Sequence, residues 1–230
     1  MSDELINDDV LEQLLTAADG VLFDLDGVLL DSSEAVHRHW EAFASWQGID
    51  QSSLLSDVHG RRAADVIAGA AHLLSTSVAE ANRWHDELEV ADQEGVVALP
   101  GALDVVTMIV KHRWAVVTSG TRDVATARMR SAGLPVPLGL VAANDISHGK
   151  PLPDPYLAGA RLLNVPASQC LAVEDSVAGL SSARAAGCQL IALTTTTDPT
   201  QLLAPVVVSD LGQVAAALRR LSSHGVAITT

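Results

Sequence analysis

Two aspartates stand two positions apart in the stretch VLFDLDGVLLDS, residues 21–32. They are Asp24 and Asp26, and they follow an apolar run that predicts a buried strand. Residues two apart on a strand face the same side, and Gly27 indicates that the chain turns directly afterwards. Carboxylates that converge on one buried point repel each other unless a cation lies among them. The pair therefore predicts a cation-binding site with a catalytic role.

Further polar residues end two later apolar runs. Thr118, Ser119 and Gly120 follow the run WAVV, and Glu174 and Asp175 close the run CLAVED. Ligands of open α/β sheets lie beyond the carboxyl ends of the strands, so we expect all these residues to gather at one edge. A site built of oxygen ligands without nearby histidine or cysteine favours Mg²⁺, which is completed by a substrate phosphate.

A hydroxyl-rich turn and a lysine indicate that the substrate carries a phosphate. The segment TSGTRD, residues 118–123, leads from a predicted strand into a helix N-terminus, whose free N–H groups and dipole favour an anion. Lys150, in the loop SHGKPLPDP, would supply a fixed positive charge. A carboxylate nucleophile, a second carboxyl as acid and base, Mg²⁺, a hydroxyl and a lysine suit phosphoryl transfer through an aspartyl-phosphate.

The elements that position these residues alternate between strand and helix. Apolar runs without strict polar alternation predict strands covered on both faces, as in a parallel sheet, at 21–25, 114–118, 170–175, 189–194 and 206–210. Helices bounded by capping residues or a terminal glycine are expected between them, at 121–133, 154–164 and 176–187. This order predicts an α/β fold with a doubly wound parallel sheet.

Residues 31–98 differ, because they show several helical stretches and no apolar strand run. Within 33–48, Val36, Trp40, Phe43 and Ala44 fall on one helical stripe. We expect a small all-α cap domain, inserted after the first strand on two linkers. The predicted organisation has three parts. Residues 1–19 form an N-terminal leader with a short helix, residues 20–30 and 99–230 form the core domain, and residues 31–98 form the cap domain.

Composition and charge limit which partners and which cellular compartment we expect for this protein. The chain has 230 residues, 48% of them apolar, and a net charge of -14, which argues against nucleic acid or an anionic membrane surface as a partner. Cys170 and Cys188 lie beside predicted core strands, so no disulfide framework is expected. Without a signal peptide or a run long enough to cross a bilayer, we expect a cytoplasmic protein. The oligomeric state stays open, with a monomer favoured.

Four motifs together resemble the phosphatase branch of the haloacid dehalogenase superfamily. They are DLDGVLLDS, VVTSGT, Lys150 with GKPLPDP, and VEDSVAGLSSARAAG, in the family's order and spacing. The helical insert resembles the cap of the subgroup that includes β-phosphoglucomutase. The segments HGRRAADVI, WAVVTSGTRD and ANDISHGKPLPDPYLAGA are most similar to phosphatases of 2-deoxyglucose 6-phosphate, hexitol phosphates or glycerol phosphate.

The resemblance implies two roles for the aspartate pair. Asp24 would be the nucleophile and a metal ligand. Asp26 would be the general acid and base, and would bind the metal through its backbone carbonyl. Members of the superfamily that cleave carbon–halogen bonds lack an acid at the Asp26 position and use no metal. Its presence therefore favours phosphate chemistry.

The second and third motifs imply phosphate contacts. Thr118 would bind the transferring phosphoryl oxygens, with the amides of Ser119 and Gly120 nearby. Lys150 would orient Asp24 and neutralise charge.

The fourth motif and the cap leave alternatives open. Asp175 would bind Mg²⁺, whereas Glu174 is either a direct metal ligand or a support for the helix that follows. In the cap, Gly60 permits a tight turn that would direct His59, Arg61 and Arg62 toward the substrate. The alternative is that the arginines only begin an exposed helix.

The function expected from these features is Mg²⁺-dependent hydrolysis of a small sugar or polyol monophosphate through an aspartyl-phosphate. One alternative is a phosphosugar mutase of the β-phosphoglucomutase type, because no core motif separates the two activities. A catalytically silent binding protein is the other alternative, and it would require a damaged motif.

Overall fold

A six-stranded parallel sheet forms the centre of the computed structural model, which describes residues 8–50, 54, 60–110 and 113–224. Its strand order is β5-β4-β1-β6-β7-β8. The strands are β1 (Gly20–Phe23), β4 (Trp114–Val117), β5 (Gly139–Val141), β6 (Cys170–Glu174), β7 (Gln189–Leu193) and β8 (Val206–Val208). Central β1 pairs Val21 with Trp114 on one side and with Leu171 on the other. All five predicted strands are confirmed, and β5 is an edge strand that the sequence analysis did not predict.

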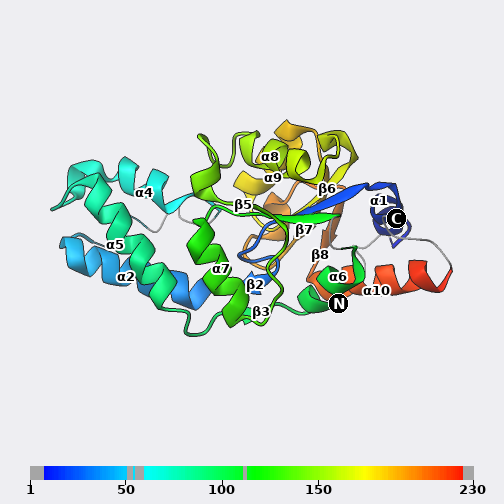
Figure 1. The fold of residues 1–230 in the computed structure, drawn as a ribbon, viewed down its shortest axis with the longest axis horizontal. Coiled ribbons are helices and arrows are strands. Elements are labelled where there is room, and N and C mark those ends of the chain that lie inside the picture. Colours follow the sequence, from blue (N-terminus) through cyan, green and yellow to red (C-terminus); the bar gives the residue numbers. More distant parts are fainter. Residues whose placement is uncertain (1–7, 51–53, 55–59, 111–112, 225–230) are drawn as a thin grey trace.

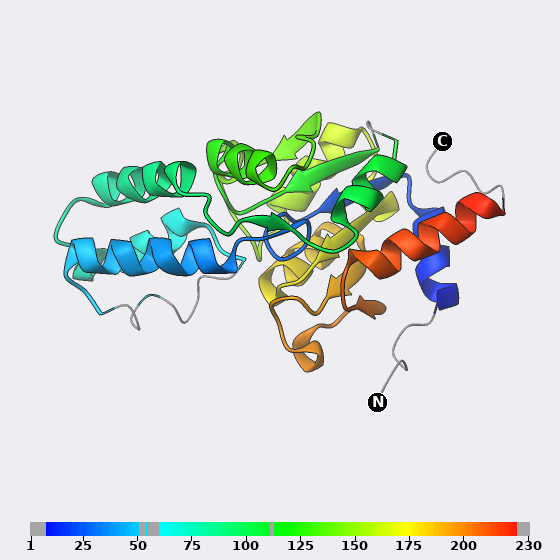
Figure 2. The same cartoon turned by 90° about the horizontal axis from the view of Figure 1, so that it is seen from below.

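Helices cover both faces of the sheet (Figures 1 and 2), and alternating side chains of the strands pack beneath them. Val21 and Phe23 join a cluster with α1, α6, α7 and α10, whereas Leu22 joins a second cluster with α8 and α9. This double coverage explains why the strands carry no polar alternation. The core helices are α1 (Asp8–Ala17), α6 (Ala102–Met108), α7 (Arg122–Ser131), α8 (Asp154–Leu163), α9 (Val177–Ala186) and α10 (Leu211–Ser223). Short 3₁₀ turns lie at Ala143–Asp145, Ala167–Gln169 and Pro199–Gln201. The doubly wound α/β fold is confirmed.

Further helices project beyond one end of the sheet, at the left of Figures 1 and 2. They are α2 (Ser33–Gln47), α4 (Ala63–Gly69) and α5 (Val78–Ala91), with a 3₁₀ turn at Ala71–Leu73. They share their own apolar cluster around Trp40 and Phe43. Trp46 and Trp84 stack beside it, with ring centroids 4.6 Å apart and 12° between the ring planes. Val36, expected on the same stripe, packs against this cluster and is only partly buried.

The two segments that join this helical block to the sheet domain pair with each other. They form the antiparallel strands β2 (Leu30–Asp31) and β3 (Val97–Ala98), in which Leu30 is opposite Ala98 and Asp31 is opposite Val97. The chain therefore leaves and re-enters the sheet domain at one place, next to the two expected linkers. These strands were not anticipated, because two residues are too few to show a periodic pattern.

Two expectations from composition bear on the described residues. Cys170 and Cys188 are buried free thiols, as expected. None of the described helices has the length and apolar character needed to cross a membrane.

Candidate active site

A tight turn after β1 places Asp24 and Asp26 at the carboxyl edge of the sheet. The Asp24 amide donates to the carbonyl of Val173 on β6 (3.0 Å), which continues the strand pairing by one residue. The carbonyl of Leu25 then accepts from the next three amides after Gly27, which closes the turn. Gly27 has φ +81°, and a Cβ there would collide with the carboxylate of Asp175. Only glycine fits both the backbone conformation and this close approach.

Lys150 joins two buried carboxylates beneath this turn. Its Nζ lies 2.8 Å from Asp24 Oδ1 and 2.6 Å from Glu174 Oε1, and the lysine side chain is 1% exposed. The loop between β5 and α8 that carries Lys150 thus brings its charge under the aspartate turn. The two carboxylates outweigh the effect of burial and raise the pKa of Lys150 above its ordinary value. Lys150 is therefore a permanent cation against Asp24.

Glu174 is held by donors on both of its carboxylate oxygens. Oε1 accepts from Lys150 and from the hydroxyl of Tyr156 (2.8 Å). Oε2 accepts from the amides of Asp175 and Ser176 and from the Ser176 hydroxyl, at 3.1–3.2 Å. Ser176 itself caps α9, where its Oγ accepts from the amide of Gly179. This arrangement suits a support for Lys150 and the helix start better than a direct metal ligand.

The carboxylates of Asp24, Glu174 and Asp175 form a cluster with the donor set of a hard cation. One oxygen of each lies within 4.8 Å of the others. Asp175 Oδ2 accepts from the Thr196 hydroxyl, whereas Oδ1 is buried without a hydrogen-bond partner among the described residues. An orphaned carboxylate oxygen beside a second carboxylate fits a divalent cation such as Mg²⁺, which takes oxygen ligands.

Burial makes ionisation of this cluster costly. It raises the pKa of Asp24 to about 7, with Lys150 acting against the shift and Glu174 adding to it. Burial, followed by the charges of Glu174 and Asp24, also raises the pKa of Asp175 well above its ordinary value. A bound cation would favour the ionised forms, because opposite charge nearby offsets the cost of desolvation.

Asp26 is held from two directions through a single oxygen. Its Oδ1 accepts from the Ser32 hydroxyl (2.6 Å) and from the Arg128 guanidinium (2.8 Å). The other edge of that guanidinium donates to Glu89 Oε1 on α5 (2.6 Å). The two partners of Asp26 and the further link from Arg128 to Glu89 were not predicted from the sequence. The one signal for Arg128 was a charge on the buried stripe of a helix, because Val124, Ala125, Arg128 and Met129 form the buried side of α7.

The motif after β4 lies against both the sheet and the cap. Thr118 is buried, and its Oγ1 accepts from the amide of Gly120 (3.1 Å). The Ser119 hydroxyl donates to the carbonyl of Gly60 in the helical block (2.8 Å). Ser119 therefore contributes a contact between the two parts of the chain in addition to its expected place near the phosphate.

A cavity of about 120 Å³ opens between the sheet edge and the helical block. From the sheet domain it is lined by Asp24, Asp26, Ser119, Gly120, Asp175 and others; the helical block contributes Trp40, Arg61, Arg62, His85, Asp86 and Glu89. Most of the expected site residues thus meet around one space, with Lys150 and Glu174 buried beneath Asp24. His59 lies outside the described residues.

The two cap arginines have different surroundings. Arg61 is exposed and lines the cavity. Arg62 precedes α4, and its guanidinium pairs with Asp65 (2.7 Å) while donating to the carbonyls of Ile146 and Ser147. Arg62 therefore ties the helical block to a loop of the sheet domain, a role beyond the start of an exposed helix.

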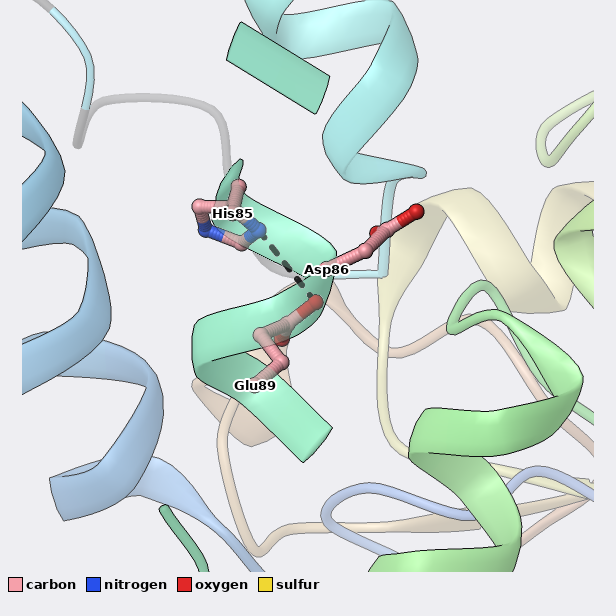
Figure 3. A group of neighbouring side chains, drawn as sticks. All are labelled: His85, Asp86 and Glu89. Atoms are coloured by element: carbon pink, nitrogen blue, oxygen red, sulfur yellow. Dashed lines mark ion pairs between the residues drawn. The ribbon is translucent and has the colours of Figure 1, made fainter. Parts of the chain in front are cut away.

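The cap side of the cavity carries a second polar group on α5 (Figure 3). His85 and Glu89 face one another with Nδ1 and Oε2 3.3 Å apart, whereas Asp86 points away from them. Ligand atoms of the three lie within 4.8 Å. Since Glu89 is already paired with Arg128, a metal ion here would lie close to a guanidinium cation, and the group suits metal binding less well than the core cluster.

Comparison with known proteins agrees with the motifs. Residues 18–187 match the family model of the haloacid dehalogenase-like hydrolases. The chain is 40% identical to hexitol phosphatase A of Escherichia coli over 190 residues, which cover 80% of this chain and 86% of that protein. It is 34% identical to glycerol-1-phosphate phosphohydrolase 2 of Saccharomyces cerevisiae, over 77% of this chain and 75% of that protein.

Solved structures share the fold. CbbY from Rhodobacter sphaeroides in complex with phosphate superposes with a TM-score of 0.76 at 24% identity, covering 88% of this chain and 99% of that one. The family model spans the aspartate turn, the Lys150 loop and the Glu174–Asp175 pair. On this match and on the identity to its relatives, the chain belongs to the haloacid dehalogenase-like hydrolases.

Proposed function

We propose that this protein is a Mg²⁺-dependent phosphatase of small sugar or polyol monophosphates. The observation that carries the proposal is that Asp24, Asp26 and Asp175 line one cavity, with Lys150 buried against Asp24 behind it. Hexitol phosphatase A and the glycerol-1-phosphate phosphohydrolases are similar over most of the chain, which supports a polyol or sugar phosphate as the substrate class.

Asp24 is the proposed nucleophile. Lys150 holds its Oδ1, so the second oxygen is the one that attacks phosphorus. The bond from phosphorus to the substrate oxygen breaks as the bond to Asp24 forms, which gives an aspartyl-phosphate and an alcohol. Lys150 neutralises part of the negative charge that the phosphoryl group brings into this buried place.

Asp26 is the proposed acid and base. The contacts that Ser32 and Arg128 make with its carboxylate both fall on Oδ1, so Oδ2 is the oxygen assigned to proton transfer. It delivers a proton to the departing alcohol oxygen in the first step. In the second step it takes a proton from the water that cleaves the aspartyl-phosphate.

Asp24, Asp175 and the backbone carbonyl of Asp26 are the proposed ligands of Mg²⁺. When bound, the ion would supply positive charge to the carboxylates and to the phosphate oxygens. Glu174 is assigned to support Lys150, because both of its oxygens already accept hydrogen bonds. Thr118 and the amides of Ser119 and Gly120 are proposed phosphate contacts, and Arg61 is a proposed substrate contact from the cap.

A phosphate-release screen tests the function. The panel contains hexitol, deoxyhexose, hexose and glycerol phosphates with Mg²⁺, and Asp24→Asn serves as the blank. We expect phosphate release that EDTA abolishes and Mg²⁺ restores. If a hexose bisphosphate primes turnover and a rearranged sugar phosphate accumulates instead, the protein is a mutase. If no ester on the panel releases phosphate, the proposal is wrong.

A further inference from the structure

Arg128 connects the acid–base candidate to the cap. It lies on α7 of the sheet domain and is 4% exposed. One edge of its guanidinium donates to Asp26 Oδ1 at 2.8 Å, and the other donates to Glu89 Oε1 on α5 at 2.6 Å. A single buried cation therefore has one anionic partner in each part of the chain.

Arg128 and its two carboxylate partners stabilise one another. The guanidinium is buried between Asp26 Oδ1 and Glu89 Oε1, at 2.8 and 2.6 Å, so each ion pair offsets part of the cost of burying these charges. Burial acts to raise the pKa of Glu89, yet Arg128 and His85 bring it down to about 2. Removing one partner would leave a buried charge unpaired, which is strongly unfavourable. The two ion pairs therefore stabilise the arrangement in which α5 of the cap lies beside α7 of the sheet domain.

The geometry of the guanidinium gives Glu89 a second effect. An arginine fork binds a carboxylate best through two parallel hydrogen bonds, one to each oxygen. Glu89 occupies one nitrogen of the fork, so Asp26 is contacted through Oδ1 alone. Without Glu89, the fork is available to take both oxygens of Asp26, including the one that must exchange a proton.

We propose that Arg128 and Glu89 are positioning residues that make the placement of the Asp26 carboxylate depend on the seating of the cap. When α5 is in place, Glu89 accepts from one side of the guanidinium, so Arg128 fixes Asp26 through Oδ1 and leaves Oδ2 available for proton transfer. When α5 is displaced, Arg128 donates to both oxygens of Asp26, and Oδ2 can no longer transfer a proton freely. The inference rests on the proposed function, since it concerns how Asp26 performs its step.

Two phosphate esters with opposite need for an acid test this coupling. A hexitol or glycerol phosphate expels an alkoxide, which must be protonated, whereas 4-nitrophenyl phosphate expels a stable anion without help. The parameter is kcat/KM, which covers the steps up to the aspartyl-phosphate. The variants are Glu89→Gln, which keeps the shape but weakens the hold on Arg128, and Arg128→Lys, which removes the fork. Arg38→Gln is the matched control, because it breaks an arginine–carboxylate pair with Asp92 (2.9 Å) that lies within the cap.

We expect kcat/KM for the polyol phosphate to fall roughly 10- to 100-fold in both variants, a part of the 10²- to 10⁴-fold that a positioned acid contributes. For 4-nitrophenyl phosphate it should stay within about threefold of wild type, as it should for Arg38→Gln on both esters. Should Arg128→Lys fail to fold by circular dichroism, Glu89→Gln decides, since it keeps Arg128 on Asp26. An equal loss on both esters, or no loss on either, overturns the coupling. A wild-type protein that hydrolyses neither ester contradicts the proposed function itself.

Discussion

Replacing Asp24 by asparagine should stabilise the metal-free protein at alkaline pH. The folded protein raises the pKa of this carboxyl from 3.8 to about 7, chiefly by burying it. Above pH 4 the unfolded chain ionises Asp24 freely, whereas the folded chain resists ionisation until about pH 7. The free energy of unfolding of the wild type therefore decreases as pH rises between these values, and the full penalty applies above pH 7.

The size of the effect follows from the shift. One pKa unit corresponds to 1.36 kcal/mol, so a shift from 3.8 to about 7 corresponds to at most about 4 kcal/mol. Asparagine resembles the protonated carboxyl in shape and carries no charge, so the variant avoids this penalty. Its gain should approach about 4 kcal/mol near pH 8 and remain below about 2 kcal/mol near pH 5. A gain of that size near pH 8 raises Tm by on the order of 10 °C.

Urea unfolding in EDTA, near pH 5 and near pH 8, measures the difference. Asp104→Asn is the control, because this carboxylate is 55% exposed and its ion-pair partner among the described residues is Arg219 at the surface. It should change the free energy of unfolding by no more than about 0.5 kcal/mol. Added Mg²⁺ should narrow or reverse the advantage of Asp24→Asn, since the ion stabilises the wild-type carboxylate. The reasoning fails if the variant in EDTA near pH 8 is no more stable than wild type.

Further substitutions test the supports of the site and of the cap. Tyr156→Phe removes a buried donor to Glu174 (2.8 Å) and should cost about 1–3 kcal/mol in urea unfolding; a change near zero would mean that the hydroxyl does not support the carboxylate. Gly179→Ala places a Cβ against the Glu174 carboxylate and should lower both Tm and phosphate release, by about 1–3 kcal/mol in stability, whereas Gly69→Ala meets nothing within 4 Å and should be tolerated. Phe43→Ala, at a 0% exposed position in the apolar cluster of the helical block, should cost about 3–5 kcal/mol, and hydrogen exchange should show the loss in α2 and α5 before the sheet. Uniform exchange across the chain would contradict a separate cap core.

The sheet could be predicted from sequence where burial is complete. Each residue of β1, β4 and β6 is buried, and such strands appear as short apolar runs ending in polar residues. Edge strand β5 has only three residues, and β2 and β3 have two each, so no periodicity marks them. Strand β8 is as short as β5 but could be predicted, because all three of its residues are valine. Length and composition together therefore separated the elements that could be predicted from those that could not.

The candidate site likewise contains residues that could be predicted from the sequence and residues that could not. Asp24, Asp175 and Lys150 come from the ends of strands or a loop at one edge of a parallel sheet, so their meeting follows from topology. The contact between Arg128 and Glu89 depends on how two helices from different parts of the chain face each other, which no local pattern specifies. A charged residue on the buried stripe of each helix was the one available indication.

The pairing of β2 with β3 gives the helical block an unusual status in the topology of the chain. Leu30 opposite Ala98 and Asp31 opposite Val97 are the last paired residues of an antiparallel ribbon, and everything between them acts as an oversized hairpin loop. A loop of this kind can be shortened, lengthened or replaced by another without any change in the strand order of the sheet. The proposed active-site edge and the helical block are thereby continuous in the chain only through this narrow stem, and side-chain contacts such as Arg128 with Glu89 make the other connections described here.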